Sequence, residues 1–242
     1  EEVRKEFEQE KQELTVKLEE QVHELMGDRP INLNSPEQLS WIIYSRKVND
    51  KPTWAEAYDD RVSNTQHTDN IRRLTTKLYK QKAERCNECY GSGQIRKTRK
   101  DGTPHKNTNK CPTCSSTGFL YTNKKDFAGL KFIAPDYKWA SANGFSTSKG
   151  NLIYLEGIAR SRGMHDAEAF LQRVRRLSAL DTYLSSFVEG IATHVKPDGM
   201  LHVRLLQHRT GTGRLSGADP NMQNMPRGGT FPVKKVFISR WD

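Results

Sequence analysis

Four cysteines have the spacing that most directly predicts chemistry in this chain. Cys86 and Cys89 form one Cys-x-x-Cys pair, Cys111 and Cys114 form a second, and 21 residues separate the pairs. Thiolates at this spacing bind zinc tetrahedrally, and four of them leave no open position for water or substrate. The pattern therefore predicts a structural Zn²⁺ site. Two redox pairs or spare reduced thiols stay open as alternatives, although no thioredoxin-like βαβ pattern surrounds either pair.

The stretch 210–226, with the sequence TGTGRLSGADPNMQNMP, carries a second set of polar groups that could bind a ligand. It is poor in apolar residues, so it suits contact with a polar ligand better than it suits a core. Short hydroxyls, a guanidinium and side-chain amides match phosphate oxygens, sugars and groove-facing base edges. The candidate DNA-binding residues in it are Thr212, Arg214, Ser216, Asn221, Gln223 and Asn224.

The composition favours a polyanionic partner. Lys and Arg outnumber Asp and Glu by 39 to 29, giving a formal net charge of +10, which attracts nucleic acid through screened attraction and counterion release. A basic but merely well-solvated protein is the alternative. With 34% hydrophobic residues among 242, long helices or exposed arms are expected instead of one compact globule.

No stretch of the sequence has the features of a signal peptide or a membrane span, because no apolar run approaches the ~20 residues that cross a bilayer. We therefore expect an intracellular protein, cytoplasmic or nucleoid-associated, with no membrane partner; a viral source stays open. The paired cysteines fit a reducing compartment. The chain lacks an initiating Met and ends at Trp241-Asp242 after an apolar run, so we expect a piece of a longer polypeptide.

Apolar residues at helical spacing predict the helices that position these groups. Gly27 is placed to end the first helix. Ser35 and Pro36 are placed to begin the second, with Gln38 closing a capping box. Asp166 is expected to cap the longest helix of the second half. The predicted helical ranges are 1–26, 35 to about 46, 71–82, 152–162 and 166–191.

Strands are expected at turn signals between the helices, so the fold class is predicted as α+β. Residues 94–100 and the turn 101–103 predict a basic two-stranded ribbon, and the turn 197–199 predicts a β-hairpin over 191–206. A further strand is expected at 233–238, and irregular stretches are expected at 48–70 and 126–150.

Basic, aromatic and histidine side chains outside the two candidate sites have less specific roles. Residues 82–125 hold ten Lys or Arg against three acids, an excess of 10 − 3 = +7 that favours contact with a nucleic-acid backbone over simple solvation. The aromatics of 126–150 are expected to pack under a helix, with stacking on unpaired bases as the alternative. The arginines of 173–176 grip phosphates or face solvent. His194, His202 and His208 are not expected to bind metal.

Two parts of the chain resemble family A DNA polymerases, the DNA polymerase I family. The run TGRLS at 212–216 with DPNMQNMP at 219–226 is similar to the family's TGRLSS and DPNLQNIP motifs, and 22–39 is similar to its junction of palm and thumb. The resemblance covers about residues 1–46 and 150–242. It implies a helical thumb and an incomplete antiparallel palm sheet. It also implies part of a DNA-directed DNA polymerase, a nucleotidyltransferase of DNA replication or repair.

The resemblance implies a role for each candidate DNA-binding residue. Arg214 would donate to N3 or O2 in the minor groove at the primer terminus, where every correct base pair offers an acceptor. The amides Asn221, Gln223 and Asn224 would contact primer and template nucleotides, and the hydroxyls Thr212 and Ser216 would support backbone contacts. The implied partners are primer–template DNA and, for the intact protein, deoxynucleoside triphosphates and Mg²⁺. A monomer is expected.

The chain departs from the family pattern at several positions. Gly217-Ala218 replaces a pair of small hydroxyl residues, Met222 and Met225 are volume-conserving replacements, and Arg227 directly follows Pro226. The two aspartates that hold the family's magnesium ions are expected beyond residue 242. No catalytic residue is therefore assigned, and we expect the chain alone to be inactive.

The cysteine segment is absent from the family pattern, so it is predicted to be an insertion into the thumb. Its first knuckle resembles the zinc domain of DnaJ-type chaperones over about thirty residues. A non-catalytic zinc-ribbon module, nucleic-acid-binding or chaperone-like, remains the alternative function. The predicted segments are 1–47 (palm and thumb junction), 48–81 (linker and basic helix), 82–125 (zinc ribbon), 126–190 (thumb arm and helices) and 191–242 (start of the palm).

Overall fold

The computed structural model describes residues 2–45, 78–98, 104–135, 137–141, 144–207, 209, 211–225 and 231. Contacts divide the chain into two units, one formed by Glu1–Val16 with Arg173–Asp242 and the other by Lys17–Gln172. Helices and small antiparallel two-stranded sheets make up the described residues, so the predicted α+β class is confirmed. The five predicted segments stay a prediction.

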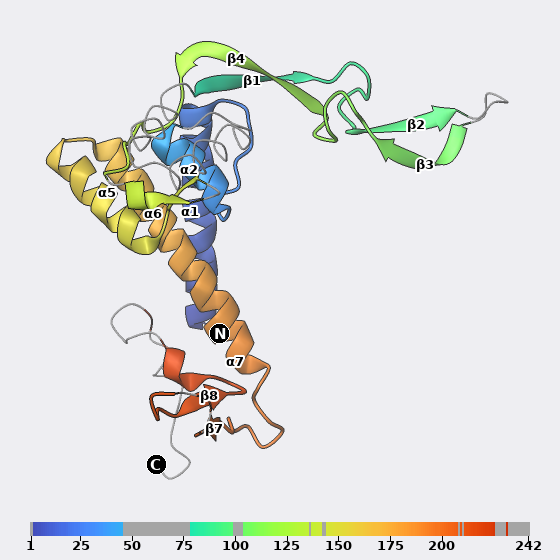
Figure 1. Ribbon diagram of the computed structural model, residues 1–242. Helices are drawn as coiled ribbons and strands as arrows, with labels where there is room; N and C mark the ends of the chain where they lie inside the picture. The colour runs from blue at the N-terminus through green and yellow to red at the C-terminus, as the bar shows by residue number, and fades with distance from the viewer. Residues whose placement is uncertain are drawn as a thin grey trace. The chain divides into compact units, whose positions relative to one another are not determined.

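Helix α1 spans Glu2–Met26 (Figure 1), in agreement with the helix predicted from the apolar stripe. Leu18 and Val22 on that stripe are buried and Leu25 is half-buried, and Met26 at the end of the helix is also buried. Gly27 ends the helix in the left-handed region at φ +83°, where glycine carries no Cβ penalty. Its backbone N–H donates to His23 O at 2.9 Å.

Helix α2 spans Pro36–Tyr44 and begins as its sequence predicts. The Ser35 hydroxyl accepts from the Gln38 N–H at 3.4 Å, and Pro36 occupies the first turn. The predicted capping box is wrong in one respect, because the Gln38 side chain accepts from Asn32 N at 2.7 Å and not from Ser35 N. The helix ends slightly before the predicted limit, since Ser45 turns left-handed at φ 51°.

Two further helices follow in the second half of the chain. Helix α5 spans Lys149–Ser161 and starts three residues before the prediction, because Ser148 caps it through Asn151 N. Helix α6 spans His165–Thr182, so Asp166 lies in its first turn and is not the predicted cap. A carboxylate there still interacts favourably with the helix dipole. A π-helical turn, η3 (Tyr183–Glu189), and α7 (Gly190–Ala192) continue it.

Four strands form two antiparallel hairpins around the cysteines. Strands β2 (Gln94–Thr98) and β3 (Pro104–Lys110) pair, which confirms the predicted ribbon. Strands β1 (Tyr79–Arg85) and β4 (Phe119–Phe127) also pair, and this ladder was not predicted. The helix predicted over 71–82 is wrong from Tyr79 onward, because this segment pairs with β4 and the Tyr79 ring stacks on Phe127 at 5.1 Å. Residues 71–77 lie outside the described residues.

The hairpin of β1 and β4 joins the end of α1 through main-chain contacts (Figure 1). Asp28 N donates to Gln81 O at 2.8 Å, and the Asp28 carboxylate accepts from Ala83 N at 2.9 Å. The Ala83 hydrogen bond holds the pKa of Asp28 below its usual value; desolvation opposes this shift, and the hydrogen bond with His23 adds to it. A Cβ on Gly27 would lie 2.2 Å from Gln81 O. Gly27 therefore both ends the helix and admits the strand.

Residues 128–145, which follow β4 in the chain, have little regular structure, so the irregular stretch predicted at 126–150 is confirmed except at its ends, which belong to β4 and α5. They contain the short elements η2 (Tyr137–Trp139), β5 (Ala140–Ser141) and β6 (Gly144–Phe145). Phe132 and Phe145 are buried, and the Phe145 ring lies 5.0 Å from that of Tyr44 in α2. The prediction that these aromatics pack against a helix is confirmed for the Phe145 ring, and Phe132 is buried.

The hairpin predicted over 191–206 is largely wrong. Its turn forms, with Gly199 N donating to Lys196 O at 2.8 Å, but the flanking segments meet only at a Val195–Leu201 bridge among the described residues. Strand β7 (Arg204–Leu206) pairs with β8 (Ser216–Ala218) instead. The His202 imidazole lies 2.9 Å from the Asp198 carboxylate. His208 and the strand predicted at 233–238 lie outside the described residues.

The first unit has its own core around α6 and η3. Leu180, Tyr183 and Leu184 pack with Phe231, whose ring stacks on Tyr183 at 4.3 Å. Arg176 forms two hydrogen bonds with the Glu10 carboxylate at 2.6 and 2.7 Å, and its guanidinium lies over the Phe231 ring. Arg176, one of the arginines considered for phosphate contact, therefore forms an ion pair with Glu10 of the same chain.

No helix within the described ranges is both long and apolar enough to cross a bilayer.

Candidate metal centre and nucleic-acid interface

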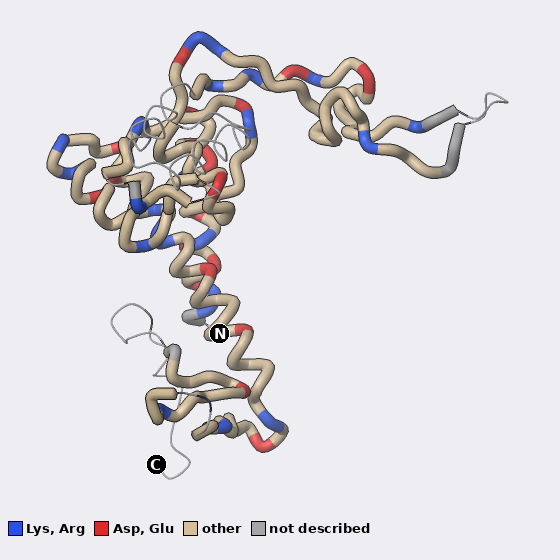
Figure 2. Tube along the Cα trace, viewed as in Figure 1, with Lys and Arg blue, Asp and Glu red and all other residues tan. Residues whose placement is uncertain are grey.

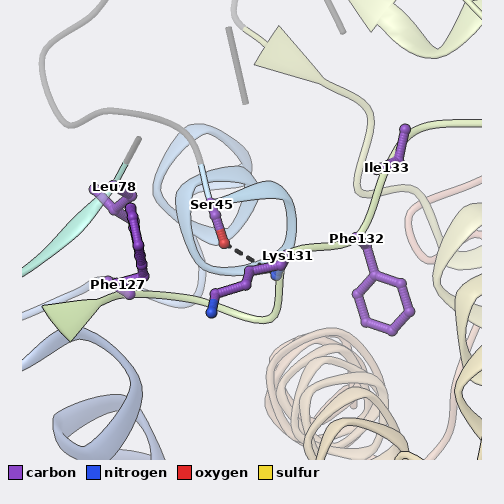
Figure 3. Close-up of a pocket in the computed structure, with 7 residues that line it drawn as sticks. Ser45, Leu78, Phe127, Lys131, Phe132 and Ile133 are labelled. Atoms are coloured by element: carbon purple, nitrogen blue, oxygen red, sulfur yellow. Dashed lines mark hydrogen bonds between the residues drawn. The ribbon is translucent and has the colours of Figure 1, made fainter. Parts of the chain in front are cut away.

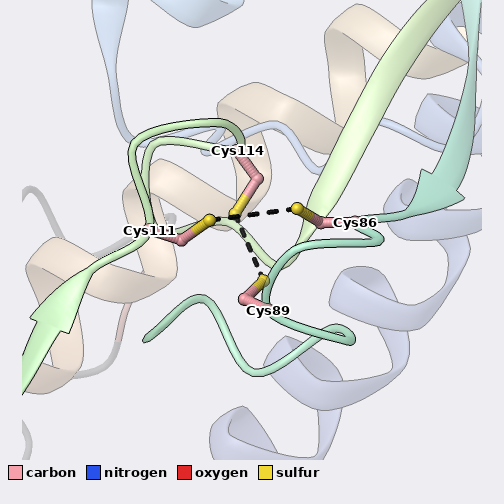
Figure 4. A group of neighbouring side chains, drawn as sticks. All are labelled: Cys86, Cys89, Cys111 and Cys114. Carbon is pink, nitrogen blue, oxygen red and sulfur yellow. Dashed lines mark hydrogen bonds between the residues drawn. The ribbon is translucent and has the colours of Figure 1, made fainter. Parts of the chain in front are cut away.

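The four cysteines converge at the junction of the two hairpins (Figure 4). All four are buried, and their sulfurs lie within 4.8 Å of one another. The Sγ atoms of Cys86 and Cys111 are 3.9 Å apart, and those of Cys89 and Cys114 are 3.6 Å apart. Tetrahedral zinc with Zn–S bonds of about 2.3 Å places its sulfurs about 3.8 Å apart. The cluster therefore fits a metal such as zinc.

The two knuckles repeat the same hydrogen bonds. Gly93 N donates to Cys89 Sγ and Gly118 N donates to Cys114 Sγ, both at 3.3 Å. Cys86 N donates to Gly118 O at 2.9 Å, and Cys111 N donates to Gly93 O at 3.0 Å. The hydroxyls of Ser92 and Thr117, which are equivalent, each donate to the preceding cysteine carbonyl. The site therefore has approximate twofold symmetry in its backbone and its sulfur contacts.

Glycines permit the close approach of the two knuckles. Both Gly93 and Gly118 have positive φ. A Cβ on Gly93 would lie 2.4 Å from Ser116 O, and one on Gly118 would lie 2.4 Å from Gly91 O. Any other residue would push the two knuckles apart and misplace the sulfurs.

The cysteines differ in acidity. Burial raises the pKa of the Cys89 thiol, but hydrogen bonds from Gly93 N–H and from the thiols of Cys114 and Cys86 lower it more, to about 7. A backbone hydrogen bond from Cys114 lowers the pKa of Cys111, while burial and the neighbouring thiols raise it to about 12. One thiol thus ionises near neutral pH, and thiolate is the form that captures a metal.

The polar stretch 211–225 forms a compact loop around β8. Both polar groups of the Gln223 side chain form hydrogen bonds within the loop. Its amide donates to Leu215 O at 2.9 Å, and its carbonyl accepts from Gly217 N at 3.1 Å. The Asn221 carbonyl accepts from Gln223 N at 3.1 Å. Gln223 therefore holds the loop in shape, a role that the sequence did not reveal.

Gly217 leaves room for the Asn221 side chain. A Cβ at this position would lie 2.8 Å from the Asn221 Oδ1 atom. A larger residue here would therefore crowd Asn221 unless that side chain moved. The loop is also tied to β7 by an exposed ion pair between Arg204 and Asp219 at 2.8 Å.

The predicted DNA-binding residues occupy different places on this loop. Thr212, Arg214 and Asn221 are exposed, and Ser216 is half-buried in β8. Gln223 is exposed as a residue, although both polar ends of its side chain are engaged. The side chain of Asn224, together with Thr210 and Pro226, lies outside the described residues.

An apolar cavity of about 290 Å³ lies where β4 ends, near α2 (Figure 3). Lys131 is the charged group among its described lining residues, and its backbone N–H donates to Ser45 Oγ at 2.9 Å. This lining lacks the paired acids, thiols or histidines that would suggest catalysis. The lining residues are Ser45, Leu78, Phe127, Ala128, Lys131, Phe132 and Ile133.

The chain shows partial sequence similarity to DNA polymerases of the DNA polymerase I type. It is 39% identical over 110 residues to DNA polymerase I of Streptococcus pneumoniae strain R6, which is 44% of this chain and 11% of that protein. DNA polymerase I of Bacillus subtilis is 37% identical over 84 residues, 34% of this chain and 8% of that protein.

The thermostable DNA polymerase I of Thermus filiformis is 39% identical over 82 residues, 34% of this chain and 9% of that protein. The matched stretches thus span about a tenth of these relatives. No protein-family model matches the chain. The similarity supports a DNA polymerase-related segment.

Proposed function

We propose that this chain is part of a family A DNA-directed DNA polymerase and grips primer–template DNA during replication or repair. The observation that carries the proposal is the 39% identity over 110 residues with a DNA polymerase I. The exposed loop 211–225 supports it, because it combines a guanidinium, amides and a hydroxyl in a shape fixed by its own hydrogen bonds. A loop that is already ordered loses less entropy when it binds.

Within this loop, Arg214 is the proposed minor-groove donor at the primer terminus. A single donor there reads the acceptor common to all correct base pairs and is therefore tolerant of sequence. Asn221 and Asn224 are proposed to contact primer and template nucleotides, and Thr212 and Ser216 to support backbone contacts. Gln223 acts chiefly as a positioning residue, because its side chain binds Leu215 and Gly217.

Nucleotide addition by the intact polymerase would require two magnesium ions, which activate the primer hydroxyl and stabilise the leaving pyrophosphate. We assign no residue of this chain to hold them. The substrates of the intact protein would be deoxynucleoside triphosphates. A primer-extension assay on the 242-residue chain should give no product above background, and measurable extension would overturn this part of the proposal.

The four cysteines are proposed to bind one structural zinc ion. The metal would lock the two knuckles together and so fix the β1–β4 and β2–β3 hairpins as one arm. Metal analysis of the purified chain should give one zinc per molecule, and Cys86→Ser should lose most of it. Stoichiometric zinc in both proteins would show that the zinc binds elsewhere. A native chain that is purified without zinc and binds added iron but not added zinc would show that the site holds iron instead.

DNA binding tests the polymerase assignment. Fluorescence anisotropy with a primed duplex should show a loss of about tenfold or more for Arg214→Ala, the size of one specific base contact. Arg162→Ala is the control, because it removes the same charge from an exposed site outside the loop. Equal losses of affinity in both variants would mean that Arg214 contributes only its positive charge and makes no specific base contact. Equal binding of single strands and primed duplex by wild type and Arg214→Ala would favour the alternative of a zinc-ribbon module without polymerase function.

A further inference from the structure

The two cysteine knuckles repeat one another closely, so their differences are informative. Residues 86–94 and 111–119 correspond position by position and share the glycine, hydroxyl and sulfur contacts described above. Two positions carry an aromatic ring in one knuckle and a polar residue in the other. Tyr90 corresponds to Ser115, and Phe119 corresponds to Gln94.

Neither ring is needed to build the metal centre. Tyr90 and Ser115 have the same left-handed backbone, with φ of 52° and 51°. The knuckle with Ser115 makes the same bond to its cysteine sulfur as the knuckle with Tyr90. Tyr90 is 75% exposed and Phe119 is 42% exposed. Most of Tyr90 and a large part of Phe119 therefore face solvent, and a contact outside the chain would explain them.

Arg85 connects the two residues that carry these rings. Its Nε donates to the backbone carbonyl of Tyr90 at 2.7 Å, and Arg85 is the cross-strand partner of Phe119 in the β1–β4 ladder. Directly opposed residues in an antiparallel pair place their side chains on the same face. Phe119 therefore shares a face with Arg85, and Arg85 reaches the backbone of Tyr90, which directly follows Cys89; we call these three residues the aromatic patch.

The segment that carries this patch is basic, and its charge favours a polyanionic ligand. Residues 82–125 carry a side-chain excess of +7, and four thiolates with one Zn²⁺ would contribute −2, leaving +5. Lys and Arg occur on both hairpins (Figure 2). Exposed aromatic rings among basic residues are the combination that binds unpaired nucleotides, because bases stack on the rings while the cations meet the phosphates.

We propose that the aromatic patch of Arg85, Tyr90 and Phe119 binds unpaired bases of a nucleic-acid strand. The choice of nucleic acid over an acidic protein rests partly on the proposed function above. The patch is distinct from the loop 211–225: it would take single-stranded nucleotides without sequence preference, whereas the loop would contact the paired primer end.

The test exchanges each ring for the residue that its own counterpart uses. The double variant Tyr90→Ser with Phe119→Gln should keep zinc, since both residues already occur at these positions in the other knuckle. Its affinity for a fluorescein-labelled (dT)20 strand should fall at least about tenfold, as expected for the loss of stacking on two rings. The matched control, Ser115→Ala with Gln94→Ala, should bind (dT)20 like wild type. Measurements at two salt concentrations should show a similar loss, because stacking is not screened.

The remaining outcomes separate this inference from the proposed function. Unchanged (dT)20 affinity in a zinc-loaded Tyr90→Ser/Phe119→Gln variant overturns the patch, whatever Arg214→Ala does to primed duplex. A loss confined to a labelled poly-glutamate peptide, with (dT)20 binding intact, would also overturn it and indicate an acidic protein. Loss of (dT)20 binding here, together with unaltered duplex binding in Arg214→Ala, would support the patch while the polymerase assignment fails.

Discussion

Replacing Gly118 by alanine should disrupt the metal centre through the backbone, without removing any ligand. The added Cβ would lie 2.4 Å from Gly91 O, at a residue with φ +78°. Left-handed backbone costs a non-glycine residue roughly 1–2 kcal/mol, and forced overpacking costs about 1–3 kcal/mol more. A total of about 2–5 kcal/mol corresponds to zinc binding weakened from about 30-fold to several thousand-fold.

Competition with a chromogenic chelator would measure the zinc affinity, and far-UV circular dichroism would verify that the helices persist. Gly157→Ala is the control, because nothing lies within 4 Å of the added Cβ and its backbone is helical. That change should leave zinc affinity intact and stabilise the helix by about 0.5–1 kcal/mol. Wild-type zinc affinity in Gly118→Ala would refute the reasoning that a tight backbone crossing holds the knuckles.

Two further substitutions test interactions in the first unit. Gln223→Ala removes the side-chain hydrogen bonds to Leu215 O and to Gly217 N in β8, and leaves the buried Gly217 N–H without this partner, a cost of about 1–3 kcal/mol. Limited proteolysis within 211–225 should accelerate, and an unchanged cleavage rate would contradict the positioning role. The Arg176 hydrogen bond lowers the pKa of Glu10 below 4.5, and partial burial opposes this shift. The pair therefore stabilises the fold above about pH 4.5, and this stabilisation is lost as the pH falls through the lowered pKa. Glu10→Gln should therefore reduce the free energy of unfolding by about 1 kcal/mol at pH 7 and by much less at pH 3, as measured by urea denaturation; equal losses at both pH values would exclude the ionic contribution.

Local signals in the sequence were sufficient for several elements. The stripe through Leu18, Val22 and Leu25 predicted α1, and Ser35 with Pro36 predicted the start of α2, because capping and periodicity act over a few residues. The paired cysteines predicted the sulfur cluster for the same reason. Their spacing is a direct constraint on which atoms can meet.

Contacts between residues distant in the sequence could not be predicted from local signals. Lys80, Gln81 and Lys82 favour a helix by local propensity, yet they form β1 because β4, about 40 residues later, supplies the ladder. The hairpin predicted over 191–206 failed for a similar reason, since β7 pairs with β8 and not with its nearer neighbour. Tertiary pairing outweighed local preference in both cases.

The candidate DNA-binding site shows the same limit at the level of side chains. The motif identified Asn221 and Gln223 as polar residues, but it did not show that the Gln223 amide would be engaged by Leu215 and Gly217. The glycine at position 217 was noted only as a departure from a motif. Its closeness to Asn221 depends on how the loop folds, so the sequence did not predict it.

The base of the β1–β4 hairpin makes the cysteine arm removable. Ala128 N donates to Leu78 O at 2.9 Å, and Tyr79 pairs with Phe127, so the chain enters and leaves the arm at neighbouring points. Strands that close can be joined by a two-residue turn such as Asn-Gly. Replacing residues 80–126 in this way would remove the contacts of Gln81 and Ala83 with Asp28 but keep α1, α2 and the loop 211–225 in the chain. The arm's contribution to the proposed nucleic-acid binding could then be measured by subtraction.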